Sequence, residues 1–324
     1  MFDLLGSRRY LRTKLSRSPI RKPPRLRAGD VVGVVAPAGA VDGERLAAGI
    51  KVLEAWGVRV EVGSAVLDRH NYLAGADDAR RADLERMLGD PRVRAIVCAR
   101  GGYGSQRLVP SLDFGTLARD PKPIVGYSDA TALLTAAVAA GVVAIHGPMV
   151  ADDLARGLAA RSEGRLRALL MDADLLWDVE APETVTPGRA TGHLMGGCLS
   201  VLVSMLGTPY APDTDGAILF LEDVAERPYR LDRLLTQLRQ AGKLDRVAGV
   251  VFGTMAACPP VDGVGPLDVV RACCDDLPCP IAYGLPAGHD PNKAGSENMA
   301  LPFGVQVTLD ADRGRLTALE PAVV

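Results

Sequence analysis

The chain has 324 residues, of which 48% are hydrophobic and 23% are charged, a composition typical of a folded globular protein. Its formal net charge of -2 excludes the strong basic excess that proteins binding nucleic-acid polymers normally carry. No apolar run approaches the roughly 18 residues of a membrane-spanning helix, so we expect no association with a membrane.

The first 27 residues differ from the rest, because they carry nine Lys or Arg against the single acid Asp3. We interpret residues 1–25 as a disordered basic arm. Residues 7–12, Ser-Arg-Arg-Tyr-Leu-Arg, are loosely similar to a twin-arginine export signal, but Lys14 and Arg17 interrupt the apolar stretch that should follow. The prediction is therefore a cytoplasmic protein, with export as the alternative.

Strand and helix patterns alternate over residues 26–171, which we predict to form the first folded domain. Residues 30–37 are a continuous apolar run between turn residues, typical of a strand buried on both faces. Further strands are predicted at 58–62, 95–99, 123–127 and 142–145, and helical patterns cover 42–57, 77–88 and 130–140. This alternation predicts an α/β fold with a parallel sheet, whose ligand site lies beyond the carboxyl ends of the strands.

The pattern breaks over residues 172–188, which are rich in acids and contain Pro182 and Pro187, and we predict a linker there. A second domain is expected over 189–324, with strands at 217–221, 247–252, 280–283 and 305–309 and a helix at 229–241. This mixture predicts a smaller α+β domain.

Ser128 lies directly between the predicted strand 123–127 and the predicted helix 130–140. A serine on such a tight turn exposes its hydroxyl above the sheet, as in a nucleophile elbow. Gly126 and Ala130 are small enough to let the strand and the helix approach closely. The alternative is that Ser128 only caps the helix, since serine is a favoured N-cap residue.

A glycine-rich loop, Arg100-Gly101-Gly102-Tyr103-Gly104, follows the predicted strand 95–99. Backbone N–H groups of such a loop can bind an anion, and we expect one of them to donate to an oxyanion beside the N–H of Asp129. The spacing does not match the dinucleotide-binding GxGxxG motif. The alternative is a purely structural turn.

A base and a carboxylate can be proposed from later segments. Glu222 ends the apolar strand 217–221, where it could orient an imidazole, although acids also mark solvated strand ends. Of the four histidines, His289 lies on a Gly/Pro loop that displays side chains, whereas we expect His146 to shape the pocket. A metal site of His146, His193 and His289 is an alternative, but it lacks the local spacing of metal ligands.

Six cysteines at irregular spacing include no CxxC pair, which favours reduced thiols in the cytoplasm over disulfides or a zinc site. The six are Cys98, Cys198, Cys258, Cys273, Cys274 and Cys279.

Seven short motifs together resemble the LD-carboxypeptidase family, serine peptidases that include murein tetrapeptide carboxypeptidases and microcin-immunity hydrolases. They are residues 34–37, 100–104, 126–129, 146–148, 192–197, 221–223 and 288–289, in the family's order. The resemblance covers essentially residues 26–324. It implies a flavodoxin-like N-terminal domain, a smaller β-rich C-terminal domain, and an active site at their interface.

The resemblance also implies the roles of single residues. Ser128 corresponds to the nucleophile, Glu222 to the triad carboxylate and His289 to the base, and Gly102 and Asp129 to the oxyanion hole. Cys198 departs from the family, which often has Asn there. The resemblance implies a homodimer, and it implies no metal or organic cofactor.

The implied substrate is an amide between an L-centre and a terminal D-amino acid, typically meso-diaminopimelate to D-Ala in a cytoplasmic muropeptide. Recognition of its terminal carboxylate requires a cation, and the candidates are Arg100, Arg230 and Arg233. Tyr103 and His146 are further candidate substrate contacts.

Two other functions fit the same motifs. A hydrolase of microcin-like peptidyl nucleotides would need an aromatic side chain to stack the base, and Trp177 could supply it. A nucleotide- or sugar-binding module without catalysis could use the same glycine-rich loops. Replacing Ser128 with Ala separates catalysis from binding.

Overall fold

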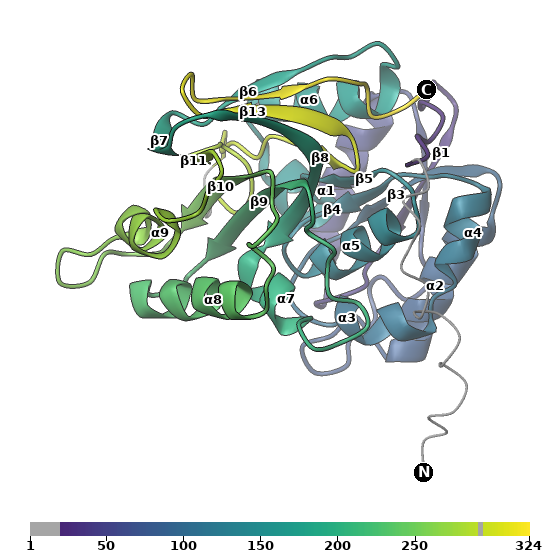
Figure 1. Cartoon of the computed structure of the whole chain (residues 1–324). Helices are drawn as coiled ribbons and strands as arrows, with labels where there is room; N and C mark the ends of the chain where they lie inside the picture. Colours follow the sequence, from purple (N-terminus) through teal and green to yellow (C-terminus); the bar gives the residue numbers. More distant parts are fainter. Residues whose placement is uncertain (1–19, 291–293) are drawn as a thin grey trace.

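Five segments of the first half form parallel strands in the computed structural model, which describes residues 20–290 and 294–324 (Figure 1). They are β1 (Val31–Val35), β2 (Arg59–Val62), β3 (Val93–Cys98), β4 (Ile124–Gly126) and β5 (Ala144–His146). Their order across the sheet, β2-β1-β3-β4-β5, is that of flavodoxin-like folds. The predicted flavodoxin-like sheet is confirmed.

The helices between these strands bury the apolar side chains of the sheet. They are α1 (Gly43–Ala55), α2 (Asp77–Gly89), α3 (Ser105–Leu108), α4 (Phe114–Arg119), α5 (Thr131–Ala139) and α6 (Ala160–Met171), with one-turn helices η1 (Val109–Ser111), η2 (Ser128–Ala130) and η3 (Val150–Leu154). Helix α1 begins where the Asp42 side chain accepts the Arg45 N–H at 2.9 Å. Helices α2 to α5 contact one another, whereas α1 packs on η3.

The second half forms a mixed sheet of eight strands, in the order β6-β14-β13-β8-β9-β10-β11-β7. Four central strands are parallel to one another: β8 (Arg189–Cys198), β9 (Ala217–Val224), β10 (Gly249–Ala256) and β11 (Ile281–Tyr283). The outer strands β13 (Gln306–Asp310), β14 (Arg315–Ala318), β6 (Asp178–Glu180) and β7 (Glu183–Thr186) are antiparallel to their neighbours. This is the β-rich C-terminal unit that the sequence predicts.

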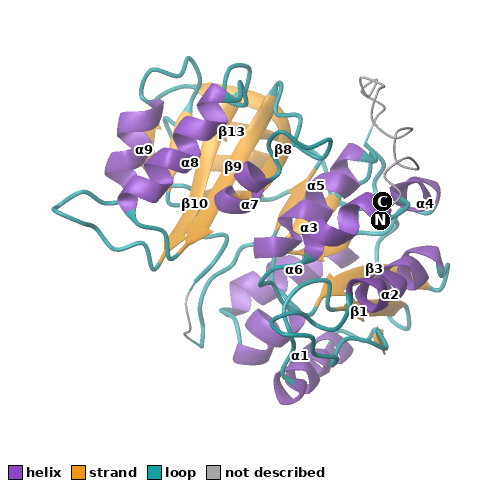
Figure 2. Cartoon of the chain, turned by 90° about the horizontal axis from the view of Figure 1, so that it is seen from below, coloured by secondary structure: helices purple, strands orange, loops and turns teal. Residues whose placement is uncertain are grey.

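Three helices, α7 (Leu199–Ser204), α8 (Pro228–Gln240) and α9 (Pro266–Cys274), lie along this sheet (Figure 2). Helix α8 buries Leu231, Leu235 and Leu238, which are spaced four and three residues apart and therefore share one face.

Three segments lie where the sequence did not place them. The expected linker 172–188 contains β6 and β7, which add to opposite edges of the second sheet. Residues 20–25 belong to the folded body, because the Arg21 N–H donates to the Gly141 carbonyl and the Arg25 N–H to that of Val324. The rest of the expected arm, residues 1–19, lies outside the described residues. Strand β12 (Leu301–Phe303) leaves the second half and pairs antiparallel with β5 in the first sheet.

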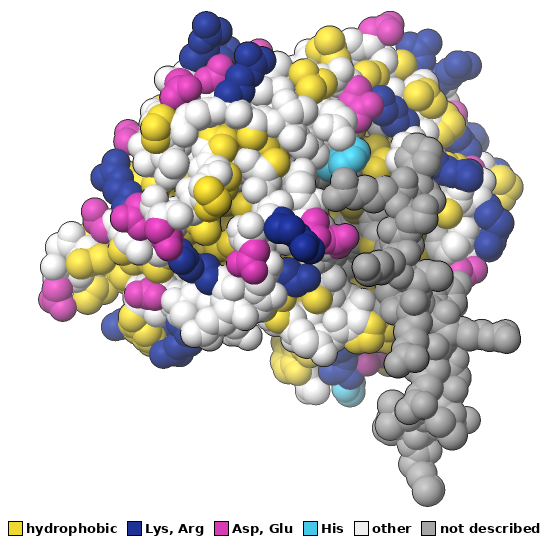
Figure 3. Space-filling model, in the orientation of Figure 1, with side chains coloured by type: hydrophobic (Ala, Val, Ile, Leu, Met, Phe, Trp, Pro, Cys, Tyr) yellow, Lys and Arg dark blue, Asp and Glu magenta, His cyan; other side chains and the backbone are white. Residues whose placement is uncertain are grey.

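Within the described residues, no helix combines the length and apolarity needed to cross a membrane. Lys and Arg side chains are interspersed with Asp and Glu over the face seen in Figure 3. The described residues on that face therefore form no continuous basic surface.

Candidate active site

A pocket of about 230 Å³ opens between the two halves of the chain. One wall comes from segments that follow β3, β4 and β5. The other comes from Val224, the last residue of β9, and from His289 and Asp290 in the loop after β11. This position is the carboxyl edge of the first sheet, as predicted for a doubly wound fold. The lining residues are Arg100, Gly101, Gly102, Tyr127, Ser128, Met149, Asp152, Arg156, Val224, His289 and Asp290.

Ser128 lies at the sharp turn between β4 and α5, with a φ of +59°. This left-handed conformation is uncommon for a residue with a side chain and is typical of strained functional positions. Ser128 is the first residue of η2. The N-cap residue of η2 is Tyr127, and the N-cap residue of α5 is Ala130. The alternative that Ser128 serves as a helix cap therefore does not agree with the geometry.

Two glycines allow the turn to pack closely. A Cβ on Gly126 would lie 2.9 Å from the Ala130 Cβ and 3.1 Å from the Cys98 Sγ, so a larger residue would push β4 and η2 apart. A Cβ on Gly101 would lie 3.1 Å from the Ser128 Oγ. The serine hydroxyl thus lies directly against the glycine-rich loop.

The glycine-rich loop is held in place from both sides. Gly102 and Gly104 have φ values of +114° and +135°, which only glycine adopts readily. The Gly101 carbonyl accepts the Gly39 N–H at 3.0 Å, and the Asp129 carboxylate accepts the Ser105 N–H at 2.7 Å. Burial raises the pKa of Asp129, although the hydrogen bonds from Ser105 oppose the rise. The loop and the serine turn are therefore one connected structure.

Glu222 and His289 form a buried pair beside this turn. Glu222 Oε2 lies 2.7 Å from His289 Nδ1 and also accepts the His289 backbone N–H at 3.0 Å. The Glu222 side chain is fully buried, whereas the His289 side chain is 16% exposed and lines the pocket. A carboxylate fixed on Nδ1 leaves Nε2 of the imidazole for proton exchange.

The pKa values of the pair move apart. Burial raises the pKa of Glu222, but the charge and hydrogen bond of His289 outweigh it and leave that pKa below 4.5. Burial lowers the pKa of His289, but the charge and hydrogen bond of Glu222 leave it above 6.5. The pair therefore favours an ionised carboxylate next to an imidazole of increased basicity.

Gly288 makes this contact possible. Its φ is +106°, and a Cβ there would lie 2.5 Å from Glu222 Oε2. The Gly288 N–H donates to Asn298 Oδ1 at 3.0 Å, which fixes the backbone just before His289.

Four charged or aromatic residues of the pocket were not predicted from the sequence, namely Tyr127, Asp152, Arg156 and Asp290. The Tyr127 ring packs edge-on against His289 with ring centroids 5.0 Å apart, and its hydroxyl donates to Asp153 Oδ1 at 3.2 Å. Arg156 also contacts Asp153, with 3.1 Å between Nη2 and Oδ1. The signal for Asp152 and Arg156 was their place just after β5, at the carboxyl edge of the sheet.

Of the predicted substrate contacts, the structure brings only Arg100 into this pocket among the residues it describes. Tyr103 is 48% exposed and faces Tyr72, with 6.0 Å between ring centroids. Arg230 pairs with Glu226, and Arg233 lies over the Tyr229 ring, both along α8.

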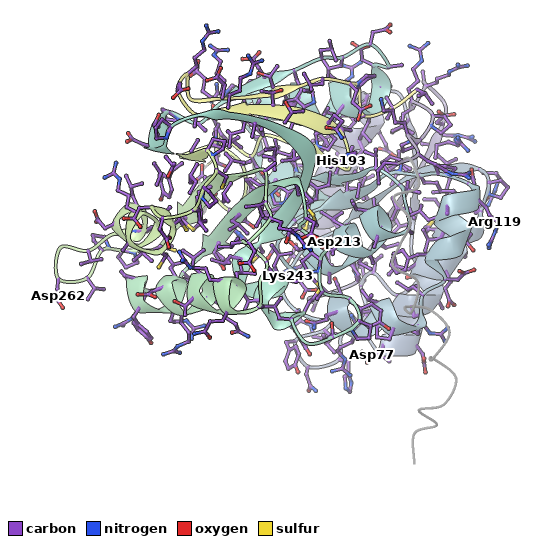
Figure 4. The ribbon with its side chains drawn as sticks, viewed as in Figure 1. Asp77, Arg119, His193, Asp213, Lys243 and Asp262 are labelled. Carbon is purple, nitrogen blue, oxygen red and sulfur yellow. The ribbon has the colours of Figure 1, made fainter. Side chains whose placement is uncertain are left out.

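His146, which we expected to shape the pocket, is fully buried and does not line it. Its ring packs against Phe220, with ring centroids 4.9 Å apart, and burial lowers its pKa to about 4. His193 lies on β8, away from the pocket, and its Nδ1 is 3.0 Å from the Gly304 carbonyl (Figure 4). The histidines considered for a metal site therefore do not meet, and the described residues include no group of three potential metal ligands.

Trp177 and Cys198 have packing roles. Trp177 is 4% exposed, and the Arg165 guanidinium lies over its ring, with 4.8 Å between Cζ and the ring centroid. The Trp177 ring is therefore not available to stack a nucleobase. Cys198 is buried next to Asp223 and Ser200, and its N–H donates to Thr131 Oγ1 at 3.1 Å. All six cysteines are unpaired.

Comparison with known proteins agrees with this architecture. The models of the LD-carboxypeptidase N-terminal and C-terminal domains match residues 32–147 and 191–309. A Bacillus subtilis protein named "Probable murein peptide carboxypeptidase" is 38% identical, over 89% of this chain and 91% of the relative. The murein tetrapeptide carboxypeptidase of Pseudomonas aeruginosa is 36% identical, over 88% of this chain and 94% of its own.

Two solved structures share the fold. The muramoyltetrapeptide carboxypeptidase of Oxalobacter formigenes superimposes with a TM-score of 0.79 at 30% identity, over 89% of this chain and 97% of that one. MccF in complex with glutamyl sulfamoyl guanosine superimposes with a TM-score of 0.83 at 21% identity, over 94% and 99% of the two chains. At that identity the second likeness concerns the fold alone.

Proposed function

The chain belongs to the LD-carboxypeptidase family, and we propose that it is a serine carboxypeptidase that releases the terminal D-amino acid from murein tetrapeptide. Its family makes it a peptidase, and relatives at 36% and 38% identity are named for murein peptides. One observation carries the chemical part of the proposal. Ser128, on its strained turn, and His289, paired with buried Glu222, line the same pocket.

In the proposed acylation step, His289 Nε2 takes the hydroxyl proton of Ser128 as Oγ attacks the scissile carbonyl carbon. Glu222 holds the resulting imidazolium. The tetrahedral oxyanion accepts hydrogen bonds from the N–H groups of Gly102 and Asp129, and losing one such donor raises the barrier by about 3 kcal/mol. The imidazolium then protonates the leaving amine, the C–N bond breaks, and an acyl-enzyme remains.

Deacylation reverses these roles with water as the nucleophile. His289 takes a proton from water, the hydroxide attacks the ester carbonyl, and the proton returns to Ser128 Oγ as the C–O bond breaks. The chain's own groups suffice for this sequence, so the proposal includes no metal and no organic cofactor.

Two guanidinium groups, Arg100 and Arg156, line the pocket and suit an exopeptidase. A guanidinium binds a carboxylate through two parallel hydrogen bonds and can anchor the free terminus of the substrate. Asp152 and Asp290 line the same pocket, and their carboxylates can bind an ammonium group. We propose that this mixed charge recognises the terminal carboxylate of D-Ala and the charged side-chain end of meso-diaminopimelate.

Incubation with murein tetrapeptide, with mass-spectrometric detection of D-Ala, tests this function. We expect the wild-type chain to release D-Ala and the Ser128→Ala variant to release it orders of magnitude more slowly, with an unchanged circular-dichroism spectrum. Equal release by both proteins would exclude Ser128 as the nucleophile. Binding of the tetrapeptide without release by the wild type would favour a non-catalytic binding module.

Hydrolysis of peptidyl nucleotides, the alternative activity within the family, has less support in this chain. Its aromatic candidate, Trp177, is buried under Arg165, and Tyr127 is packed edge-on against His289. Comparing release from an aminoacyl sulfamoyl adenosine with release from murein tetrapeptide separates the two activities.

We also propose a cytoplasmic location and a homodimer. Six unpaired cysteines, five of them buried, suit a reducing compartment. Sedimentation equilibrium decides the assembly: a mass of twice 34.1 kDa is expected, and a mass of 34.1 kDa excludes the dimer.

A further inference from the structure

Three buried polar groups around Glu222 have no hydrogen-bond partner among the described residues. They are Glu222 Oε1, Asn298 Nδ2 and the ring nitrogens of His146. Glu222 and His146 are fully buried, and Asn298 is 1% exposed. A buried polar group without a hydrogen bond costs on the order of 1–3 kcal/mol, more if it is charged, so these three groups call for an explanation.

Asn298 and His146 both belong to the immediate surroundings of Glu222. Glu222 Oε2 already accepts hydrogen bonds from both N–H donors of His289, so Oε1 is the oxygen that still lacks a donor. Asn298 reaches this region through Gly288, since its Oδ1 accepts the Gly288 N–H at 3.0 Å while Gly288 lies against the Glu222 side chain. The same bond fixes which end of the amide is the oxygen, and Nδ2 is left to donate.

His146 approaches from the first sheet. Its ring packs on Phe220, two residues before Glu222 on β9 and hence on the same face of that strand. It also packs on Tyr127, with 5.7 Å between ring centroids, and on Phe303, with 5.6 Å. The charged groups that act on it are Glu222 and His289, and the Tyr127 hydroxyl is bound to Asp153.

Two donors and one acceptor are the usual surroundings of a buried water molecule, which makes about three hydrogen bonds. We propose that His146 and Asn298 position Glu222 by binding its Oε1 through one buried water molecule. Both residues are thus positioning residues, which act through Glu222 and touch neither the substrate nor the reacting atoms. This inference rests on the proposed triad.

The role requires a neutral His146. Burial lowers its pKa to about 4, so at neutral pH one ring nitrogen carries a proton that it can donate to the water. Hydrogen bonds to Oε1 spread the negative charge of Glu222. They therefore limit how strongly this carboxylate raises the basicity of His289.

The His146→Phe variant tests the proposal, because it keeps an aromatic ring of similar size and removes both nitrogens. We expect kcat for D-Ala release to fall roughly 10-fold with little change in KM, as for loss of a hydrogen bond to a charged group. The acid limb of the kcat/KM profile should move to higher pH by roughly half a unit, because the less solvated carboxylate holds the imidazolium more tightly. Phe303→Leu is the matched control, since it perturbs the same aromatic cluster without a polar atom and should leave the acid limb in place.

A double-mutant cycle separates positioning from packing. In a Glu222→Gln background, His146→Phe should have almost no further effect on kcat, since the charge on which it acts is gone. A full 10-fold loss in that background, or an acid limb that moves equally in Phe303→Leu, would overturn the proposal.

Two further measurements apply if murein tetrapeptide is not the substrate or if a variant does not fold. The rate at which an organophosphorus fluoride labels Ser128 at each pH reports the basicity of His289 without murein tetrapeptide, so an incorrect substrate assignment is recognised separately. A high-resolution crystal structure of the wild-type chain should show one water in contact with Glu222 Oε1. A direct protein partner for Oε1 in that structure would contradict the inference.

Discussion

The interaction between the Glu222 carboxylate and the His289 imidazole sets the pH range in which the site can act. Catalysis needs neutral His289, and contact with Glu222 holds the pKa of His289 above 6.5 against the opposing effect of burial. Activity should therefore fall as the pH decreases through that raised pKa. In Glu222→Gln the imidazole loses this partner, so the acid limb of kcat/KM should move to lower pH while the maximal rate drops. A limb that stays in place would show that Glu222 does not control the base.

Gly288 offers a steric test of the same pair. In Gly288→Ala the new Cβ would overlap Glu222 Oε2 at 2.5 Å and would also have to tolerate a φ of +106°. We expect a loss of roughly 1–3 kcal/mol in the free energy of unfolding and a large loss of kcat. Gly295→Ala is the control, because its φ is +79° but no atom lies within 4 Å of its Cβ position. It should lose some stability and keep its kcat; equal loss of activity in both variants would disprove the steric explanation.

At the scale of residues, position after a strand was the informative signal in the sequence. Ser128, Glu222 and His289 each follow or end an apolar strand, and the structure places them around one pocket. Arg230 and Arg233 were chosen for their charge alone, and they lie along α8 instead. Charge in a sequence does not tell which face of a helix a side chain occupies.

Among the elements, the contact between α1 and η3 supports the charged wall of the pocket. Gly49 lets the helix approach so closely that a Cβ there would lie 2.0 Å from the Val150 carbonyl oxygen. Gly49→Ala should therefore displace η3, which is followed by Arg156 and carries Asp152, and should raise KM more than it lowers kcat. Gly164→Ala, in helix α6 with open space at its Cβ, should stabilise the protein by about 0.5–1 kcal/mol without changing KM. Thermal unfolding and steady-state kinetics check both variants, and an unchanged KM in Gly49→Ala would contradict this role of α1.

The five parallel strands and helices α1, α2 and α5 of the first half were predicted closely, because the buried strands are continuous apolar runs and turn residues mark where these helices begin or end. Helices α3, α4 and α6 were not predicted. The second half was harder. β8 contains His193, Gly196 and Gly197 instead of an apolar run. The short strand β6 has acids on both sides of its one apolar residue, and β12 has a proline at its centre, so neither shows a strand pattern. Their pairing partners are far away in the chain, so tertiary contacts decide their conformation.

At the scale of the whole molecule, the two sheets are tied together by segments that cross between the halves. β12 carries the chain back to β5, and the loop that precedes it contributes Asn298 beside Gly288. The pocket therefore depends on the whole fold and cannot be assigned to one half. Sequence patterns predicted that two units exist, but they could not show this exchange, because it rests on pairing between distant residues.

Residues 20–25 close the body near the C-terminal end. Their backbone bonds with Gly141, Val143 and Val324 are joined by a 2.8 Å ion pair between Lys22 and Glu320. A chain that begins at Leu26 should be less stable than one that begins at Ile20, by roughly 1–3 kcal/mol in urea unfolding. Equal midpoints for the two chains would show that this segment contributes no stability.

The central claim is that Ser128 is a nucleophile activated by His289 across the pocket. The most direct measurement is mass spectrometry of the chain after reaction with an organophosphorus fluoride, followed by mapping of the labelled peptide. We expect a single adduct on Ser128 in the wild-type chain, and far slower labelling in His289→Ala. Labelling at another residue, or labelling of Ser128 at the same rate without the imidazole, would contradict it.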